Sequence, residues 1–179
     1  MRAARFFVLI CLGLILSACG AAPAATPTPA SKPDWFEMTL TDAQTGKPFK
    51  INDFSGKVVL IETMAMWCPN CLFQAAQVRK LHEQLGNPAD LISISLDVDV
   101  NEDQAALKQY VGEYALDWRF AVAPLGVARA LGNLYSAEYL NPPLTPMLII
   151  DREGNVHQQK YGEKSAEKLA ESLKSYLKP

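Results

Sequence analysis

The sequence predicts an α/β domain, in which a mostly parallel β-sheet carries helices on both faces and a β-hairpin precedes it. Two observations support this fold class. Segments typical of strands alternate along the chain with segments typical of amphipathic helices. The run from residue 58 to residue 67 is predominantly apolar on both faces, as expected for a strand at the centre of a covered sheet.

The first half of the domain contains a hairpin, two strands and a helix. Residues 36–51 alternate apolar and polar side chains on either side of a turn-forming segment, which predicts a β-hairpin. Strands are expected at residues 58–63 and 91–96. A helix between them ends at Gly86 and places one apolar face inward. The residues of that face are Leu72, Ala75, Val78, Leu81 and Leu85.

The second half contains three more helices and three more strands. Asn101 can cap a helix that has Gln104 three residues later and an apolar stripe beyond it. The other predicted elements are a strand at 118–122, a helix at 127–135, strands at 147–151 and 156–161, and a final helix from Ser165. Strands that alternate with helices in this way are joined by crossovers into one sheet.

A leader precedes this domain. Arg2 and Arg5 flank the start of a short apolar run at residues 6–16, too short for a permanent membrane span, which typically needs about 20 residues. This pattern is typical of an export signal, here residues 1–18. Residues 16–19, Leu-Ser-Ala-Cys, resemble the bacterial lipobox, which implies that Cys19 becomes the lipidated N-terminus. The alternative is a plain secretory signal that leaves Cys19 free.

The mature chain divides into a tether and a domain. Residues 19–33 comprise Cys19 and a stretch rich in Ala, Pro and Thr, which predicts an unstructured tether. Residues 34–179 form the predicted domain. Two acyl chains give stable anchoring in a lipid bilayer. We therefore expect the protein to be extracytoplasmic and attached to the cell membrane by lipid.

The charge balance argues against nucleic acid as a partner. The whole chain has a formal net charge of −2. Residues 1–33 contain three basic and no acidic side chains, which leaves 14 basic and 19 acidic residues, a net charge of −5, in the domain. Such a body has no electrostatic attraction to nucleic acid or to anionic lipid.

The sequence Cys68-Pro69-Asn70-Cys71, directly after Trp67, carries the chemistry. It stands where the central strand turns into a helix, so the helix N-terminus would favour a thiolate on Cys68, and Cys71 would lie one turn further on. A zinc site needs about four ligands, and the sequence has no second cysteine pair or histidine cluster. Cys11 leaves with the leader and Cys19 would carry the lipid, so only the thiols of Cys68 and Cys71 remain to react with each other.

These motifs resemble the thioredoxin fold, and more narrowly the membrane-tethered thiol–disulfide oxidoreductases of the TlpA/ResA type. The resemblance covers residues 34–179. It rests on the hairpin, Gly-Lys-Val-Val-Leu at 56–60, Trp-Cys-Pro-Asn-Cys at 67–71, Thr145-Pro146 before a strand, and Ile-Asp-x-x-Gly at 150–154. It implies a central mixed sheet flanked by helices with an N-terminal hairpin extension, and an enzyme that needs no cofactor and no metal.

The resemblance also implies roles for individual residues. Cys68 would attack and Cys71 would resolve, with Trp67, Pro69, Asn70 and Thr145 around them. Pro146 would be the cis-proline that faces the dithiol. Pro142-Pro143 is the competing candidate, because in many relatives one more residue separates this proline from the acidic end of the next strand.

Glu62 lies six residues before Cys68 on the predicted central strand. By the resemblance, this position carries the buried acid that takes a proton from the resolving thiol. Burial raises the pKa of a carboxyl group towards neutrality, which suits a general base. The alternative is a glutamate in an ion pair at an edge of the sheet.

The resemblance implies that the partners are protein disulfides and a membrane electron donor of the CcdA/DsbD type. Relatives mostly act as reductases, in cytochrome c maturation or in the maintenance of exported proteins, so we expect reduction.

Two other functions are open at this point. One is a copper protein similar to the SCO family, for which Met64 and Met66 could be soft ligands, although core packing is the simpler role. SCO-like proteins have three residues between the cysteines and a histidine before the late strand, whereas His82 and His157 are expected to face solvent. The other is a peroxiredoxin, but Ala65 stands where those enzymes have Thr or Ser.

Overall fold

The computed structural model of the protein describes residues 32–177. Its main feature is a five-stranded sheet in the order β5-β4-β3-β6-β7. The strands are β3 (Val58–Met64), β4 (Leu91–Asp97), β5 (Arg119–Val122), β6 (Met147–Ile150) and β7 (Val156–Gln158). The helices are α1 (Pro69–Leu85), α2 (Gln104–Glu113), α3 (Leu125–Leu134) and α4 (Ala166–Leu177).

The sheet is mixed. Strand β4 pairs in parallel with both β3 and β5, whereas β6 pairs antiparallel with β3 and with β7. The prediction of a mostly parallel sheet from strand alternation alone was therefore wrong, and the mixed sheet implied by the resemblance is confirmed. The short turn at residues 151–155 accounts for the antiparallel pairing of β6 with β7. The connection from α3 returns the chain so that β6 also runs antiparallel to β3, which strand alternation does not encode.

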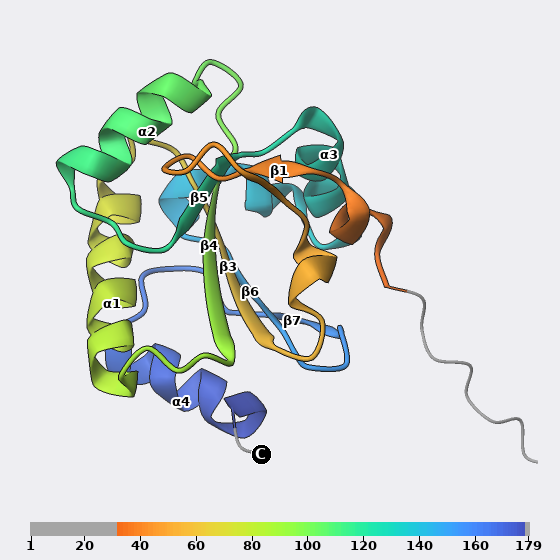
Figure 1. Ribbon diagram of the computed structural model, residues 1–179, viewed down its shortest axis with the longest axis vertical. Helices are drawn as coiled ribbons and strands as arrows, with labels where there is room; N and C mark the ends of the chain where they lie inside the picture. The colour runs from red at the N-terminus through yellow and green to blue at the C-terminus, as the bar shows by residue number, and fades with distance from the viewer. Residues whose placement is uncertain (1–31, 178–179) are drawn as a thin grey trace, which may run out of the picture. The chain divides into compact units, whose positions relative to one another are not determined.

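Two hydrophobic cores lie on opposite faces of the sheet. Helices α1, α2 and α4 cover one face, and α3 covers the other together with the N-terminal segment (Figure 1). Strand β3 contributes to both cores by alternation: Leu60 and Met64 pack with the α1 side, and Val59 and Ile61 with the α3 side. Every residue of β3 is buried, which confirms the predicted central strand.

Four short 3-10 helices complete the described part of the chain. They are η1 (Asp34–Glu37), η2 (Ile51–Phe54), η3 (Ala137–Leu140) and η4 (Pro142–Leu144). The predicted hairpin exists but is short, because β1 (Leu40–Thr41) pairs with β2 (Pro48–Phe49) over two residues and η1 and η2 replace its outer parts. Trp35 and Phe36 of η1 are buried in the α3 core, which a regular strand there would not have allowed.

The helix ends agree with the sequence patterns at one site and differ at another. Gly86 ends α1 with a φ of 68°, a left-handed conformation that glycine adopts without strain. Helix α2 is capped by Asp103, whose side chain accepts a hydrogen bond from the backbone N–H of Ala106. The prediction that Asn101 caps α2 was therefore wrong, because the Asn101 side chain donates to Asp99 instead.

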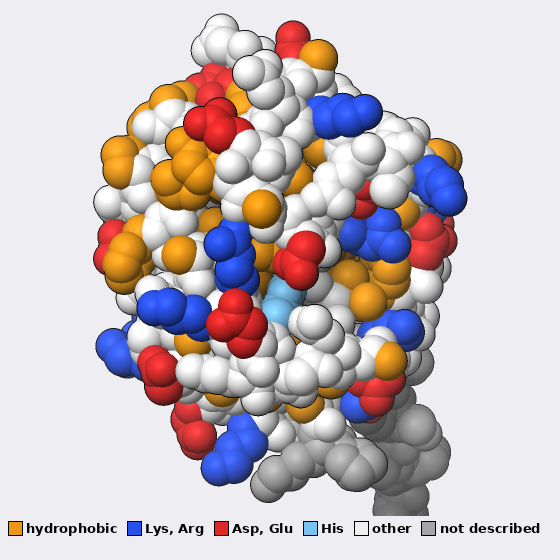
Figure 2. Space-filling model, turned by 60° about the vertical axis from the view of Figure 1, so that its left-hand side comes forward, with side chains coloured by type: hydrophobic (Ala, Val, Ile, Leu, Met, Phe, Trp, Pro, Cys, Tyr) orange, Lys and Arg blue, Asp and Glu red, His pale blue; other side chains and the backbone are white. Residues whose placement is uncertain are grey.

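On the surface on the α1 and α2 side, acidic and basic side chains are interspersed around a hollow with one histidine at its base (Figure 2). A cleft beside the edge strand β5 includes His82, Asp117 and Trp118 in its lining. No helix within residues 32–177 has both the length and the apolar character needed to cross a bilayer.

Candidate active site

Cys68 and Cys71 are joined in a disulfide at the start of α1, with their Cα atoms 5.3 Å apart. Cys68 is the N-cap of the helix, and its Sγ accepts a hydrogen bond from the backbone N–H of Cys71 at 3.1 Å. Pro69 follows in the first turn, where its missing N–H leaves no hydrogen bond unmade. The free N–H groups and the helix dipole at this end stabilise a thiolate on Cys68 once the disulfide is reduced.

The loop that precedes the cysteines is held by acidic side chains. The indole N–H of Trp67 donates to Asp99 at 2.6 Å, and the backbone N–H of Met66 donates to Glu102 at 2.8 Å. Hydrogen bonds from the backbone of Asn101 and from Trp67 hold the pKa of Asp99 below its ordinary value. Trp67 is 57% exposed whereas both cysteines are buried, so its ring is the accessible surface beside the disulfide.

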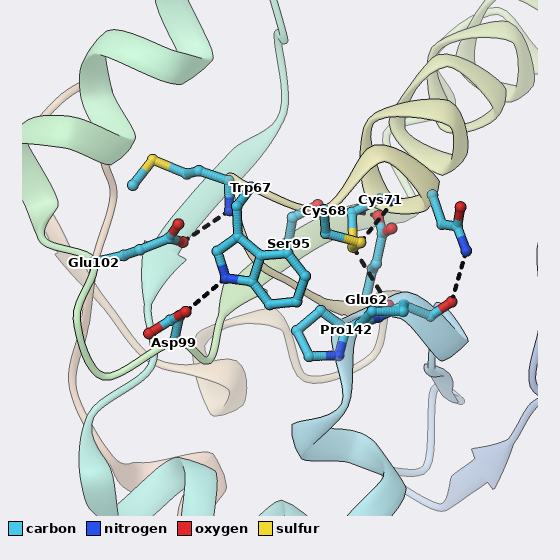
Figure 3. The surroundings of a disulfide bond; sticks show 11 residues. Glu62, Trp67, Cys68, Cys71, Ser95, Asp99, Glu102 and Pro142 are labelled. Atoms are coloured by element: carbon cyan, nitrogen blue, oxygen red, sulfur yellow. Dashed lines mark hydrogen bonds between the residues drawn. A yellow bond between two sulfur atoms is a disulfide. The ribbon is translucent and has the colours of Figure 1, made fainter.

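A proline carbonyl faces the cysteines from η4. The Sγ of Cys71 lies 3.4 Å from the carbonyl oxygen of Pro142, so the reduced thiol can donate a hydrogen bond there. The side-chain amide of Asn70 donates to the carbonyl of Pro143 at 3.0 Å. Figure 3 shows Pro142, Glu62 and Ser95 around the disulfide. The proline whose carbonyl faces the dithiol is therefore Pro142, from the competing candidate Pro142-Pro143.

Pro146 differs from its prediction. No peptide bond in the described part of the chain is cis, so the expectation of a cis Thr145–Pro146 bond was wrong. Thr145 is buried and has a φ of 43°, and this left-handed turn leads directly into β6. Pro146 then accepts a hydrogen bond from the backbone N–H of Thr63 at 3.1 Å. Its carbonyl thus serves the sheet, and the carbonyl that faces Cys71 belongs to Pro142, the competing candidate.

Glu62 is buried at the centre of the sheet, with 3% of its surface exposed. Alternation along β3 places its side chain on the same face as Leu60 and Met64, which pack in one core with Cys68 and Cys71. Its Oε2 accepts a hydrogen bond from the hydroxyl of Ser95 at 3.4 Å, and its Oε1 has no partner among residues 32–177. Burial raises the pKa of Glu62 to about 8, against the opposing effects of Lys164 and Ser95.

Glu62 is buried as predicted, and β3 is the central strand, so the alternative of a glutamate in an ion pair at a sheet edge was wrong. Its role as proton acceptor stays a prediction. The structure adds Lys164, a buried lysine that the sequence pattern did not indicate. Its ammonium group donates to the carbonyls of Thr145 at 3.2 Å and Gly162 at 2.6 Å. Burial lowers the pKa of Lys164 to about 8, and the nearby Glu62 opposes that change.

The backbone of Lys164 is clamped by Gln74 of α1. The side-chain carbonyl of Gln74 accepts from the N–H of Lys164 at 2.7 Å, and its amide donates to the carbonyl of the same residue at 3.0 Å. Nothing in the local sequence around Lys164 signals this burial, because the clamp comes from a helix 90 residues earlier.

Strand β4 carries a buried polar row that a closer reading of alternation could have found. Ser93, Ser95 and Asp97 occupy every second position of a buried strand. Burial and the neighbouring Glu102 raise the pKa of Asp97 to about 8, and its Oδ2 lies without a hydrogen-bond partner in the described residues. The row runs beside β3 and includes the residue opposite Glu62.

The residues proposed for copper have other surroundings. Met64 is buried in the α1 core and Met66 packs against it, which confirms the packing role. Both histidines are half-buried rather than solvent-facing: His82 is hydrogen-bonded to Ser93 at 2.8 Å, and His157 to Asp151 at 2.7 Å. Between Lys32 and Leu177, no three or more His, Cys, Asp or Glu side chains are grouped so that they could hold a metal ion.

Cys19, the predicted lipidation site, lies outside the described residues, as do the predicted signal peptide and most of the tether.

We predict that the protein loses stability as the pH rises from about 5 to about 8. In this window the folded state keeps the Glu62 proton, because its pKa is about 8, whereas the unfolded state, with the ordinary value of 4.5, has released it. The unfolded state is therefore favoured by up to about 1.4 kcal/mol per pH unit. Denaturant unfolding of Glu62→Gln should show a flatter pH dependence, with Asp97 supplying a remaining slope of the same sign.

Glu37→Gln is the matched control, because the Glu37 side chain is 58% exposed. It should retain the parent slope. An unchanged slope in Glu62→Gln would contradict the assignment of a shifted proton to Glu62.

Comparison with known proteins places the chain in a family. The Redoxin family matches residues 20–176. The thiol-disulfide oxidoreductase ResA of Bacillus thuringiensis subsp. konkukian is 30% identical over 138 residues, which cover 76% of this chain and 73% of ResA.

Solved structures share the fold. A thioredoxin-family thiol:disulfide interchange protein from Chlorobium tepidum has a TM-score of 0.64 at 21% identity, over 87% of this chain and 99% of that one. A SCO1/SenC family lipoprotein from Bacillus anthracis has a TM-score of 0.61 at 19% identity, over 79% and 93% of the two chains. Because both kinds of protein share the fold, the sequence match to ResA decides between them. The chain belongs to the Redoxin family, as a thioredoxin-fold thiol–disulfide oxidoreductase of the ResA-like kind.

Proposed function

We propose that this enzyme reduces disulfides of exported proteins, with Cys68 as the attacking thiol, Cys71 as the resolving thiol and Glu62 as the proton acceptor. The observation that carries this proposal is the disulfide itself. It lies at the N-terminus of α1, next to the exposed ring of Trp67 and opposite the carbonyl of Pro142.

The first step is an attack by the Cys68 thiolate on a partner disulfide. A bond forms between Cys68 Sγ and one partner sulfur, and the other partner sulfur leaves as a thiolate that takes a proton from water. The helix N-terminus favours Cys68 for this step, because it is Cys68 whose sulfur accepts the N–H of Cys71.

The second step releases the partner. Cys71 transfers its proton to ionised Glu62 and attacks Cys68 Sγ, which re-forms the internal disulfide and breaks the mixed one. The second partner sulfur leaves as a thiolate, so two electrons have passed from the dithiol to the partner. A pKa of about 8 for Glu62 allows the group to accept a proton in this direction and to return it in the reverse direction.

We predict that Cys71→Ser accumulates a mixed disulfide with a substrate such as insulin, because the resolving attack is missing. Cys68→Ser should form none and should lose reductase activity to background. Non-reducing electrophoresis with mass spectrometry of the linked peptides measures both results. The double variant Cys68→Ser/Cys71→Ser is the control. Adducts on Cys71 in Cys68→Ser, with none on Cys68 in Cys71→Ser, would reverse the two roles.

The direction of exchange is a second part of the proposal. The relatives implied by the sequence motifs act mostly as reductases, and they are supplied with electrons by a membrane donor of the CcdA/DsbD type. The proposed physiological setting is cytochrome c maturation or the maintenance of thiols in exported proteins.

For a reductase we predict a reduction potential of the Cys68–Cys71 couple near that of thioredoxin, about −270 mV. Equilibration with glutathione or dithiothreitol buffers, followed by thiol alkylation, measures it. A potential near −120 mV, the range of a strong oxidant, would show that the protein forms disulfides instead.

We also propose that the protein is held at the outer side of the cell membrane through a lipid on Cys19. The support is the Leu-Ser-Ala-Cys pattern at residues 16–19, after a charged and then apolar leader of residues 1–18. Residues 19–33 would be the tether, and residues 34–179 the catalytic domain.

This anchor predicts that the full chain, expressed in a bacterium, incorporates labelled palmitate and sediments with membranes. Cys19→Ala should incorporate none, because the thiol that receives the lipid is absent. Cys11→Ala should label like the parent, since that cysteine belongs to the leader. Parent protein that is unlabelled and recovered without membranes would refute the anchor and favour the plain secretory signal.

A further inference from the structure

Three buried side chains, those of Glu62, Ser95 and Trp118, form a second row that runs across the sheet from β3 through β4 to the residue before β5. Glu62 of β3 pairs with Ser95 of β4, and Ser95 pairs with Phe120 of β5. Trp118 lies two residues before Phe120, so alternation places its ring on the same face as Phe120 and Ser95. That face is the one covered by α1, where the cysteines lie.

The hydrogen bonds along this row have a fixed direction. The indole N–H of Trp118 donates to the Ser95 hydroxyl oxygen at 3.0 Å, and Ser95 stands 3.4 Å from Glu62 Oε2. An indole is only a donor, so Ser95 must accept from Trp118, and its one proton is left for the carboxylate. No solvent competes for that proton, because Ser95 is 1% exposed and Glu62 is 3% exposed.

We propose that Trp118 and Ser95 are positioning residues for Glu62: the indole orients the serine hydroxyl, and the hydroxyl, by donating to the carboxylate, favours its ionised, proton-accepting form. The inference rests on the proposed role of Glu62 in thiol–disulfide exchange.

Packing helps to orient the indole in the relay, by which we mean the hydrogen bonds from Trp118 to Ser95 and from Ser95 to Glu62. The Trp118 ring meets His82 edge-on, with 5.5 Å between ring centroids, and lies 5.2 Å from the ring of Phe120. Its outer side lines the cleft beside β5. The ring therefore contacts two aromatic neighbours, and its N–H points inward to Ser95.

Other groups act on Glu62 from neighbouring elements. Lys164, ahead of α4, favours the ionised carboxylate, and the hydroxyl of Tyr110 on α2 is close enough for its own pKa to be raised by Glu62. Asp97 lies two positions along β4 from Ser95. None of these three side chains bonds to Ser95 or Trp118, so variants of the relay leave them in place.

A hydroxyl that donates to a carboxylate stabilises the ionised form, and the effect is larger in a dry site. In Ser95→Ala, the midpoint of the Glu62 titration should therefore move to higher pH by about one pH unit, a change of about tenfold in the ionisation constant. Trp118→Phe keeps an aromatic ring but removes the indole N–H, which frees the Ser95 hydroxyl to rotate, so it should move the midpoint in the same direction by less.

The test follows the Glu62 carboxyl signal by NMR in the full chain with isotope-labelled glutamate, the signal being assigned by its loss in Glu62→Gln. Thr63→Val is the matched control. Thr63 is the buried neighbour of Glu62 on β3, alternation turns its side chain to the opposite face of the sheet, and its hydroxyl has no hydrogen-bond partner within residues 32–177. It should leave the midpoint unchanged. The double variant Ser95→Ala/Trp118→Phe should match Ser95→Ala alone, because Trp118 acts through Ser95.

The outcomes of this experiment either support or overturn the positioning role of Ser95 and Trp118. A Ser95→Ala midpoint equal to that of the parent, with only a lower melting temperature, overturns it, as does an additive shift in the double variant. The pH profile of disulfide exchange separates this from the proposed function. If Glu62→Gln leaves that profile intact while Ser95→Ala moves the Glu62 titration, the relay stands and the catalytic role of Glu62 fails. If Glu62→Gln removes the pH dependence of disulfide exchange but Ser95→Ala leaves the Glu62 midpoint unchanged, the catalytic role of Glu62 stands and the positioning role of Ser95 and Trp118 fails.

Discussion

The buried carboxyl group of Glu62 is the constraint on which the rest of the site depends. An ionised carboxylate in the middle of a sheet is costly unless donors and a positive charge face it. Ser95 supplies a donor from the next strand, and Lys164 supplies the charge from the segment before α4. The energetic balance between burial and these two groups gives Glu62 a pKa close to physiological pH.

The surroundings of the two cysteines differ in the same way, because one position favours a charged sulfur and the other does not. Cys68 has a helix N-terminus to stabilise its charge, whereas Cys71 lies inside the first turn, buried and opposite a carbonyl oxygen. A carbonyl accepts a hydrogen bond from a thiol but repels a thiolate, so this contact suits the proposed resolving role of Cys71, in which a base removes its proton. The asymmetry of the dithiol follows from one turn of helix and one proline carbonyl. An exposed Trp67 then marks where a partner can reach it.

Local pattern was sufficient for much of this site and failed where the determinants are distant in sequence. The strand, the turn and the helix N-terminus around Cys68 follow from short-range alternation and capping, and so does the burial of Glu62. The burial of Lys164 could not be predicted, since a lysine in a Gly-Glu-Lys-Ser segment is typical of a solvated turn. It is the side chain of Gln74 on α1 that binds the backbone of Lys164 and holds it in the protein interior. The geometry of Pro146 was mispredicted because the family pattern does not account for the left-handed Thr145 before it. The mixed sheet likewise depended on the order of the last two strands, which alternation does not encode.

The clamp between Gln74 and Lys164 has a consequence for the order in which the protein matures. Gln77, on the same helix, also binds the backbone N–H of Ala166 at the start of α4. Helix α1, which carries the dithiol, is complete at Leu85, whereas Lys164 follows Gln74 by 90 residues. The electrostatic surroundings of Glu62 are therefore assembled only when the segment around Lys164 has docked on α1, so a chain that has formed α1 without this contact has both sulfurs but not the complete site.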